Sequence, residues 1–313
     1  MVGWGLAYAA LVVTDVEAVA AALARDFGLR RTDCAAGGRE RRVPVFAVGA
    51  SGLALFAPDD PFLGHGARLG VHHIAVEVPD LAAAAGQVTL AGIPVAHAEP
   101  VPGMNGARRL LLAPEATVGV RTYLSEPVPL ERSPAGWVER IDHLGVASAD
   151  NGAGLDVFSG RLGFPLESMQ TDLEVRIAIE SFTSDRYGVV CHARPPEPVG
   201  GLRVAFVTVG DCELEFLQDV DPHHRADPAG LGPGTTKQDQ GAIARFVASR
   251  GPGLHHLALK VRDVDAALAA LGRAGYPLID PVARPGSRRA RIAFLQRQSL
   301  GGVLVHLVER ESR

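Results

Sequence analysis

One pattern occurs four times along this chain of 313 residues, and it constrains the fold more than any other feature. Each copy has a short alternating apolar run, an Asp, a stretch typical of a helix, and a Gly before another apolar segment. The copies read AYAALVVTDVEAVAAALARDFGL, HHIAVEVPDLAAAAGQVTLAGIPV, DHLGVASADNGAGLDVFSGRLGFPL and HHLALKVRDVDAALAALGRAGYPL. The chain is therefore predicted to contain four copies of one structural unit.

The four copies share one register. In each copy, one residue of the first apolar run lies seven residues before the Asp. The pairs are Tyr8 and Asp15, His73 and Asp80, His143 and Asp150, and His256 and Asp263. An Asp at a strand-to-helix junction can accept hydrogen bonds from the free N–H groups of the first helical turn. The Gly after each helix suits a left-handed C-cap, and these residues are Gly28, Gly92, Gly163 and Gly275. Each unit is therefore predicted to begin with a strand and a helix.

Alternating apolar segments follow each predicted helix, with Gly, Ser or Asp punctuation typical of hairpins. Examples are VFAVGASGLALFAP and LRVAFVTVGDCELEFLQ. We predict an α+β fold in which four tandem βαβββ modules form two cup-shaped mixed sheets. A Pro- and charge-rich piece, residues 125–139, separates the first two units from the last two. The predicted domains are residues 1–128 and 139–313, joined by a linker at 129–138, and the sequence leaves open whether units pair within or between halves.

Composition excludes several classes of protein. Hydrophobic residues make up 47% and charged residues 21%, an ordinary globular balance, and the formal net charge of -4 offers no broad basic field for nucleic acid. No apolar stretch reaches the length of about 20 residues that a bilayer requires, so we expect no membrane contact. The apolar N-terminus has no basic residue before Arg25 and is interpreted as a strand rather than a signal sequence. Three widely spaced cysteines, Cys34, Cys191 and Cys212, argue against a disulfide framework and favour a cytoplasmic location.

Two histidines occupy the same position in the third and fourth units. His143 and His256 each stand in an apolar run beside small residues, Gly145 and Ala258, that leave open space on the same face of a strand. A single histidine in a strand is more often an ordinary hydrogen-bonded residue than a ligand. Two at matching positions favour a shared site in a cavity.

The closing strands of these units add two polar residues to apolar surroundings, Glu215 in CELEFLQ and His306 in GGVLVHLVE. Burying a lone carboxylate costs on the order of several kcal/mol unless a cation or a donor meets it. We therefore predict one divalent metal ion bound by His143, Glu215, His256 and His306. Imidazoles with one carboxylate suit Zn, Fe(II), Co, Ni or Mn, and the sequence does not distinguish among them.

Other side chains could serve chemically. Glu213 shares a face with Glu215 and remains an alternative ligand. Gln218, His223 and His224 can also bind metals, but the turn DPHHRADP is more typical of a hydrated surface loop, so they are left out of the predicted set.

The first half of the chain serves as an internal control. Its residues at the four predicted ligand positions are Tyr8, Ala54, His73 and Tyr123. Only His73 could bind a metal, and one histidine cannot hold a catalytic ion. We expect one functional site per chain, with the first half acting as scaffold, pocket wall or metal-free cup, and His73 in a structural role.

These residues resemble the vicinal oxygen chelate superfamily, which includes glyoxalase I, extradiol and hydroxyphenylpyruvate dioxygenases, fosfomycin-resistance enzymes and methylmalonyl-CoA epimerases. Residues 139–310 are most similar to the epimerases, in RIDHLGVAS, VAFVTVGDCELEFLQ, GAIARFVASRGPGLHHLALKV and GGVLVHLVE. The first half resembles only the general module. The resemblance implies metal ligands at His143, Glu215 and His256, and it places His306 where the epimerases carry a metal-binding Glu thought to act as an acid/base group.

Three departures from the epimerase pattern favour a sister activity. His306 replaces that Glu, FLQRQSLGG stands where the epimerases typically read FLHPKSTGG, and the tandem chain is about twice their length. The lost Lys weakens the case for an acyl-CoA substrate. Epimerases of polyhydroxy cyclic ketones, of the 2-epi-5-epi-valiolone type, are one such sister group.

The favoured function is a metal-dependent epimerase that moves a proton at a carbon next to a carbonyl through a metal-stabilised enediolate. Its partner is a small-molecule substrate, either a polyhydroxy cyclic ketone or an acyl-CoA. His306 and Glu215 are the candidate catalytic bases, and Arg203 is the candidate for orienting the substrate. A homodimer is one option for the assembly.

Two alternatives remain. One is an Fe(II)-dependent ring-cleaving or keto-acid dioxygenase, although His306 occupies the position of that class's usual carboxylate. The other is a small-molecule-binding, resistance-type protein without catalysis.

Overall fold

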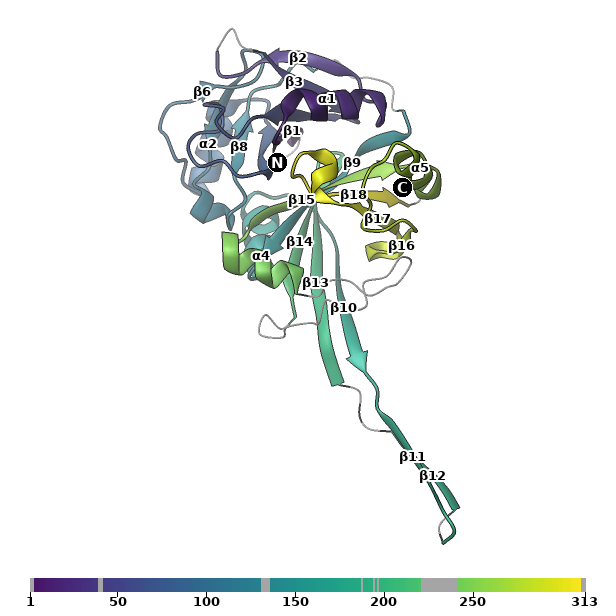
Figure 1. Cartoon of the computed structure of the whole chain (residues 1–313). Coiled ribbons are helices and arrows are strands. Elements are labelled where there is room, and N and C mark those ends of the chain that lie inside the picture. The colour runs from purple at the N-terminus through teal and green to yellow at the C-terminus, as the bar shows by residue number, and fades with distance from the viewer. Residues whose placement is uncertain are drawn as a thin grey trace.

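Two eight-stranded mixed sheets, one from each half of the chain, make up the fold of the computed structural model (Figure 1). The structure describes residues 3–38, 42–130, 136–186, 188–193, 195, 197–220 and 241–310. The predicted α+β fold of four βαβββ modules in two curled mixed sheets is confirmed.

The first sheet has the strand order β2-β3-β4-β1-β5-β8-β7-β6. Its two helices follow the first strand of each module. The elements are β1 (Gly5–Val12), α1 (Val16–Arg25), β2 (Arg31–Ala35), β3 (Arg42–Val48), β4 (Ser51–Phe56), β5 (Gly70–Glu77), α2 (Leu81–Leu90), β6 (Val101–Pro102), β7 (Arg108–Leu111) and β8 (Thr122–Ser125).

The second sheet repeats this order strand for strand, as β10-β13-β14-β9-β15-β18-β17-β16. Its elements are β9 (Val138–Ser148), α3 (Asn151–Leu155), β10 (Leu166–Arg176), β13 (Glu197–Val209), β14 (Cys212–Asp219), α4 (Ala242–Arg250), β15 (Gly253–Val261), α5 (Val264–Arg273), β16 (Arg284–Pro285), β17 (Arg291–Leu295) and β18 (Val305–Glu309). Modules pair within each half, because β1 is antiparallel to β5 and β9 is antiparallel to β15.

The predicted helix signals are present in all four modules. The N-cap residues Asp15, Asp80, Asp150 and Asp263 each accept a hydrogen bond from a backbone N–H of the first helical turn. Such a cap contributes about 0.5–2 kcal/mol. The four glycines predicted to end the helices all have a positive φ, between 66° and 85°. Local sequence therefore sets where each module turns from strand to helix and back.

The third module departs from the others. Its helix α3 spans only five residues and continues as a π-helical turn, Asp156–Arg161, in a segment with three glycines. The strands β10 and β13 then leave the sheet as a long arm, and a ribbon of β11 (Ile179–Ser184) and β12 (Gly188–Ala193) extends it away from the body (Figure 1). The arm carries several exposed large apolar side chains: Met169, Leu173, Ile177, Ile179, Phe182 and Val189. The repeated sequence pattern does not predict this arm.

One apolar core joins the two halves. It combines residues from both sheets with residues of α1, α2 and α5. At the contact, Phe27 stacks on Trp137 with ring centroids 5.4 Å apart, and the Tyr276 hydroxyl donates to Asp26 Oδ2 at 2.6 Å. The two sheets follow the two predicted halves of the chain. The exact boundary stays a prediction, since residues 131–135 of the predicted linker lie outside the described residues.

All helices in the described ranges have ten residues or fewer, and none of them could cross a membrane.

Candidate metal centre

Four neighbouring strands of the second sheet position the predicted site. In the order β14-β9-β15-β18, Glu215 pairs with Gly145, and Gly145 pairs in turn with His256. Ala258 pairs with both His143 and His306. This register aims the predicted ligands at the hollow of the curled sheet.

Three ligand atoms form a nearly regular triangle. His143 Nε2 lies 3.3 Å from His256 Nε2, and Glu215 Oε2 lies 3.2 Å from the first and 3.4 Å from the second. Ligand atoms held about 2.0–2.2 Å from a tetrahedral ion would lie roughly 3.3 Å apart. The spacing therefore fits a divalent metal.

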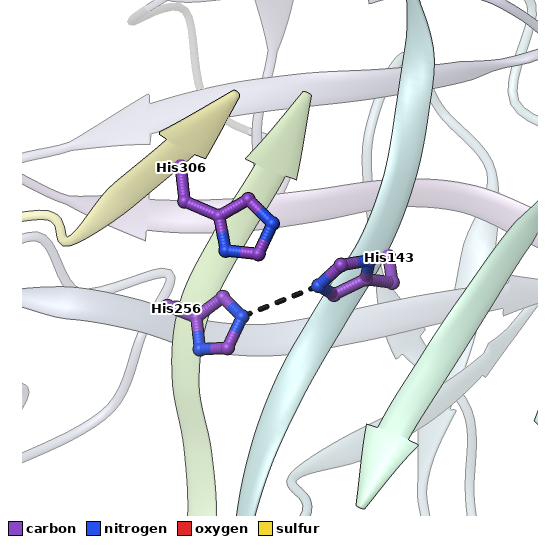
Figure 2. A group of neighbouring side chains, drawn as sticks. All are labelled: His143, His256 and His306. Carbon is purple, nitrogen blue, oxygen red and sulfur yellow. Dashed lines mark hydrogen bonds between the residues drawn. The ribbon is translucent and has the colours of Figure 1, made fainter. Parts of the chain in front are cut away.

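His306 completes the group. One nitrogen from each of His143, His256 and His306 lies within 4.8 Å of the other two, and the rings point toward one another from β9, β15 and β18 (Figure 2). Neither nitrogen of His306 has a hydrogen-bond partner among the described residues, although the side chain is only 4% exposed. Leaving a buried polar group unpaired costs about 1–3 kcal/mol. A bound ion or substrate at this place would offset that cost.

A second layer of groups orients His143. Asp142 Oδ1 accepts a hydrogen bond from His143 Nδ1 at 2.8 Å, and Arg310 Nη2 lies 2.9 Å from Asp142 Oδ2. A carboxylate on one ring nitrogen fixes the tautomer in which the other nitrogen is free to bind a metal. Sequence analysis missed Asp142, and the signal available was its place directly before the histidine in RIDH.

The electrostatics of the centre favour a cation. Burial lowers the pKa of His143, but the carboxylates of Glu215 and Asp142 outweigh it and raise that pKa to about 9. Burial raises the pKa of Glu215, yet His143 and His256 hold it well below its usual range. Burial, together with the charge on His143 and His256, lowers the pKa of His306 well below its usual value. At neutral pH His306 is therefore a neutral imidazole and Glu215 an ionised carboxylate.

Glu213 takes a different role from Glu215. Its Oε2 accepts hydrogen bonds from Arg288 Nη2 at 2.7 Å and from Arg310 Nη2 at 3.1 Å. These pairs compensate its charge without a metal. Of the two candidate carboxylates, Glu215 is the one in contact with His143 and His256.

Arg203 does not lie at the site. Its side chain is exposed, whereas its neighbours Leu202 and Val204 on β13 line the cavity. Because successive side chains of a strand face opposite sides, Arg203 points away from the cavity. The expectation that it orients the substrate is therefore not supported, and Arg284 and Arg288, which sequence analysis did not single out, line the cavity instead.

A cavity of about 830 Å³ opens over the histidines. Its apolar walls include Phe206, Phe294 and Ile243, and α4 lies along one side. Arginines are prominent among the polar lining residues: Arg245, Arg250, Arg284, Arg288, Arg297 and Arg310. Cavities of this size accept small organic ligands. His223 and His224 lie outside the described residues, so their predicted surface position stays a prediction.

The first sheet places the control residues as the sequence predicts. Ala54 and His73 both pair with Ala10, as Glu215 and His256 pair with Gly145, and Ala75 pairs with Tyr8 and Tyr123. The buried side chain of Arg109 lies at the centre of this sheet, and its Nη1 is 3.3 Å from His73 Nε2.

The chain belongs to the glyoxalase/bleomycin resistance protein/dioxygenase superfamily. The model of this family matches residues 9–110 and 142–294, which cover most of both halves. The predicted resemblance to the vicinal oxygen chelate superfamily is thereby confirmed.

Among curated proteins, the chain is similar to mitochondrial methylmalonyl-CoA epimerases. It is 29% identical to that of Dictyostelium discoideum over 131 residues, covering 40% of this chain and 69% of the relative. It is 26% identical to that of Homo sapiens over 202 residues, covering 64% of this chain and 98% of the relative. These relatives support an enzyme of this superfamily.

Two solved structures share the tandem fold along almost the whole chain. A mutant of 4-hydroxymandelate synthase from Streptomyces coelicolor superposes with a TM-score of 0.63 at 17% identity, covering 98% of this chain and 93% of that one. The Mn(II)-bound glyoxalase from Novosphingobium aromaticivorans superposes with a TM-score of 0.56 at 16% identity, covering 97% and 81%. At these identities the likeness establishes the fold alone.

Proposed function

We propose that the chain is a metal-dependent epimerase that moves a proton at a carbon next to a carbonyl. The observation that carries the proposal is the buried triangle of His143, His256 and Glu215 with the unpartnered His306 beside it, under a cavity of about 830 Å³. The named epimerase relatives support this class of reaction.

His143, Glu215 and His256 would hold one divalent ion, with His306 close enough to be a fourth ligand. The glyoxalase of the same fold is named as Mn(II)-bound, and Zn, Fe, Co and Ni also suit these donors. When bound, such an ion supplies positive charge that stabilises negative charge developing on substrate oxygens.

His306 is the group best placed to move the proton. Its imidazole is neutral, lines the cavity and has no partner among the described residues, so a ring nitrogen is available to accept a proton from the substrate carbon. Glu215 is the second candidate, because its low pKa keeps it ionised. Phe206 and Phe294 form apolar walls of the cavity beside His143 and His306, with ring centroids 5.7 Å and 4.5 Å away.

Two variants separate the roles of these residues. In Glu215→Gln we expect loss of both the metal and activity, since a ligand is removed. In His306→Gln we expect the metal to remain while activity falls by about 10²- to 10⁴-fold, the contribution of a general base. Loss of metal in His306→Gln would show that His306 is a ligand and would move the base to Glu215.

Solvent exchange tests the reaction class. We propose assays with methylmalonyl-CoA and with a polyhydroxy cyclic ketone in deuterium oxide, with mass spectrometry of the recovered compounds. Epimerisation places one deuterium at the carbon next to the carbonyl of a true substrate. Unlabelled product from either compound would reject the proton-transfer mechanism, and oxygen consumption during turnover would identify a dioxygenase instead.

A further inference from the structure

A second cavity, of about 240 Å³, lies where the two halves of the chain meet. Strands β5 and β15 approach each other in this region. The first half contributes Arg68, His72 and Arg121, and the second half contributes Arg250, His255 and Arg297. We call this cavity the arginine cleft, defined by Arg68, Arg121, Arg250 and Arg297.

The described lining of the arginine cleft carries positive charge only. Its described lining contains four arginines and no Asp or Glu. Arg250 has a weak contact with the carbonyl of Leu69, at 3.4 Å from its Nη1, and lies over the ring of Phe246 at 5.5 Å. By contrast, Arg288 in the neighbouring cavity lies within 4.0 Å of three carboxylates, those of Asp142, Glu167 and Glu213. Like charges gathered without counter-charges repel one another and attract anions.

The charges of neighbouring arginines add to the effect of burial on the pKa of two lining groups. Burial and the charge of Arg250 both lower the pKa of Arg297. Burial, with the charges of Arg121 and Arg109, lowers the pKa of His72 to about 4. In both groups the charges of the neighbouring arginines act in the direction expected where positive charges lie close together.

The backbone around the arginine cleft is held closely. Gly119 has a φ of 81°, and a Cβ atom added there would lie 2.0 Å from the carbonyl oxygen of Pro252. The two halves therefore touch backbone to backbone at this point, which brings the segments that carry Arg121 and Arg250 close together.

We propose that the arginine cleft binds a phosphate-type anion. Guanidinium groups donate paired hydrogen bonds that match phosphate oxygens, and four of them exceed what one monoanion needs. The arginine cleft shares Phe246, Arg250, His255 and Arg297 with the lining of the larger cavity. The anion can therefore be free or be the phosphate group of a ligand whose other end reaches the histidine centre.

Calorimetric titration of the full chain with inorganic pyrophosphate at low ionic strength tests the proposal. We expect saturable binding that Arg121→Gln/Arg297→Gln weakens by about tenfold or more, because each lost charge-assisted bond contributes on the order of a tenfold change in affinity. Arg273→Gln, an exposed substitution at the end of α5, is the matched control and should change the affinity less than twofold. A second variant, Arg68→Gln/Arg121→Gln, replaces the first if circular dichroism shows that the first is unfolded.

A metal-site variant separates this proposal from the proposed function. Pyrophosphate also chelates metals, so His143→Ala/His256→Ala should retain the binding if the arginine cleft is the site. Undiminished binding in a folded arginine variant, or loss of binding in the histidine variant, would overturn the proposal. No saturable binding to the unaltered chain would also overturn it, whatever the metal content or activity.

Kinetics distinguish the two sources of the anion. If the phosphate belongs to the substrate, pyrophosphate competes with it, and Arg121→Gln raises KM more than it lowers kcat. If the anion is a free effector, pyrophosphate changes kcat at saturating substrate. Either result supports an anion site in the arginine cleft.

Discussion

The two curled sheets, which we call the N-terminal cup (β1–β8) and the C-terminal cup (β9, β10 and β13–β18), have the same strand order but contain different side chains. In both sheets the same strand order brings four matching positions to the centre. In the C-terminal cup these positions carry His143, Glu215, His256 and His306 around an open cavity. In the N-terminal cup, Tyr8, Phe56, Phe62, Met104 and Tyr123 belong to a buried apolar cluster that fills the hollow. The shared strand order thus sets which positions lie at the centre of each sheet. The residues at those positions determine whether the centre can bind a metal.

The segments that follow β4 and its counterpart β14 differ between the two halves. In the first half this segment places Phe62 in the cup, where its ring stacks on Phe56 at 5.1 Å. In the second half the corresponding connection includes α4, which lines the cavity and leaves it open. The N-terminal cup is occupied by the ring of Phe62, whereas α4 forms one wall of the C-terminal cavity and leaves room for a ligand.

The N-terminal cup contains its own cation. The Arg109 guanidinium lies 3.5 Å from the centroid of Phe62 and 4.1 Å from that of Tyr123, and its Nη2 donates to the carbonyl of Phe62 at 2.7 Å. It also lies beside His73, the counterpart of His256. An arginine side chain therefore occupies the centre of one cup, where the other cup presents metal-binding donors.

Exchanging matched histidines for alanine should give the largest contrast. We expect His256→Ala to lose its metal on dialysis and to lose activity, because one corner of the ligand triangle is gone. His73→Ala should keep one ion per chain, although the cavity it creates lowers stability. Elemental analysis of both variants checks this, and equal metal content in the two would break the distinction between the cups.

Removing the built-in cation should mainly affect stability. Arg109→Ala loses two buried cation–π contacts and leaves the Phe62 carbonyl without its donor, so we expect the free energy of unfolding to fall by about 3 kcal/mol or more. Urea denaturation measures the change. Metal content should be unaltered, and loss of the ion in this variant would show that the metal site in the second sheet depends on Arg109 in the first.

Gly145 and its counterpart Ala10 provide a sharper comparison. A Cβ atom at Gly145 would lie 2.1 Å from Cε1 of His256, so Gly145→Ala must displace that imidazole. We expect metal affinity to fall on the order of 100-fold, measured by competition with a chelator. The reciprocal change, Ala10→Gly, should leave the affinity within twofold, and an equal loss in both variants would point to a general effect on folding.

The smallest expected effect is at Asp142. Asp142→Asn keeps the shape but weakens the orientation of His143, so metal affinity should drop by about 10- to 100-fold with the fold retained. The same substitution at Asp211, which accepts from the backbone N–H of Ala50, is a control that should not change the affinity. An unchanged affinity in Asp142→Asn would remove this residue from the metal centre.

Much of the fold follows from local signals that repeat. The Asp caps, the Gly helix ends and the alternating strands act over a few residues, so the four modules are predictable from the sequence. The long arm of β10 to β13 is not predictable in this way, because no local signal marks the point at which β10 and β13 extend beyond the sheet. The helix α4 was also missed, since no Asp cap precedes it.

The candidate site was predictable where it follows strand register. The four positions matched between halves coincide in the structure, and Glu215 lies with His143 and His256 as the register favours. The prediction for Arg203 finds no support in the structure, because the sequence alone does not show which alternate residues of β13 face the cavity. Arg288 could not be found either, since it reaches Glu213 from a distant loop through contacts that only tertiary structure creates.

The proposed function requires one ion in the C-terminal cup, and the N-terminal cup is expected to bind none. Crystals of the unaltered protein, with anomalous diffraction recorded above and below the absorption edge of the metal that elemental analysis identifies, test this most directly. The account predicts a single anomalous peak per chain, within bonding distance of His143, Glu215 and His256. A peak beside His73 and Arg109, or no peak within reach of His143 and His256, would contradict it.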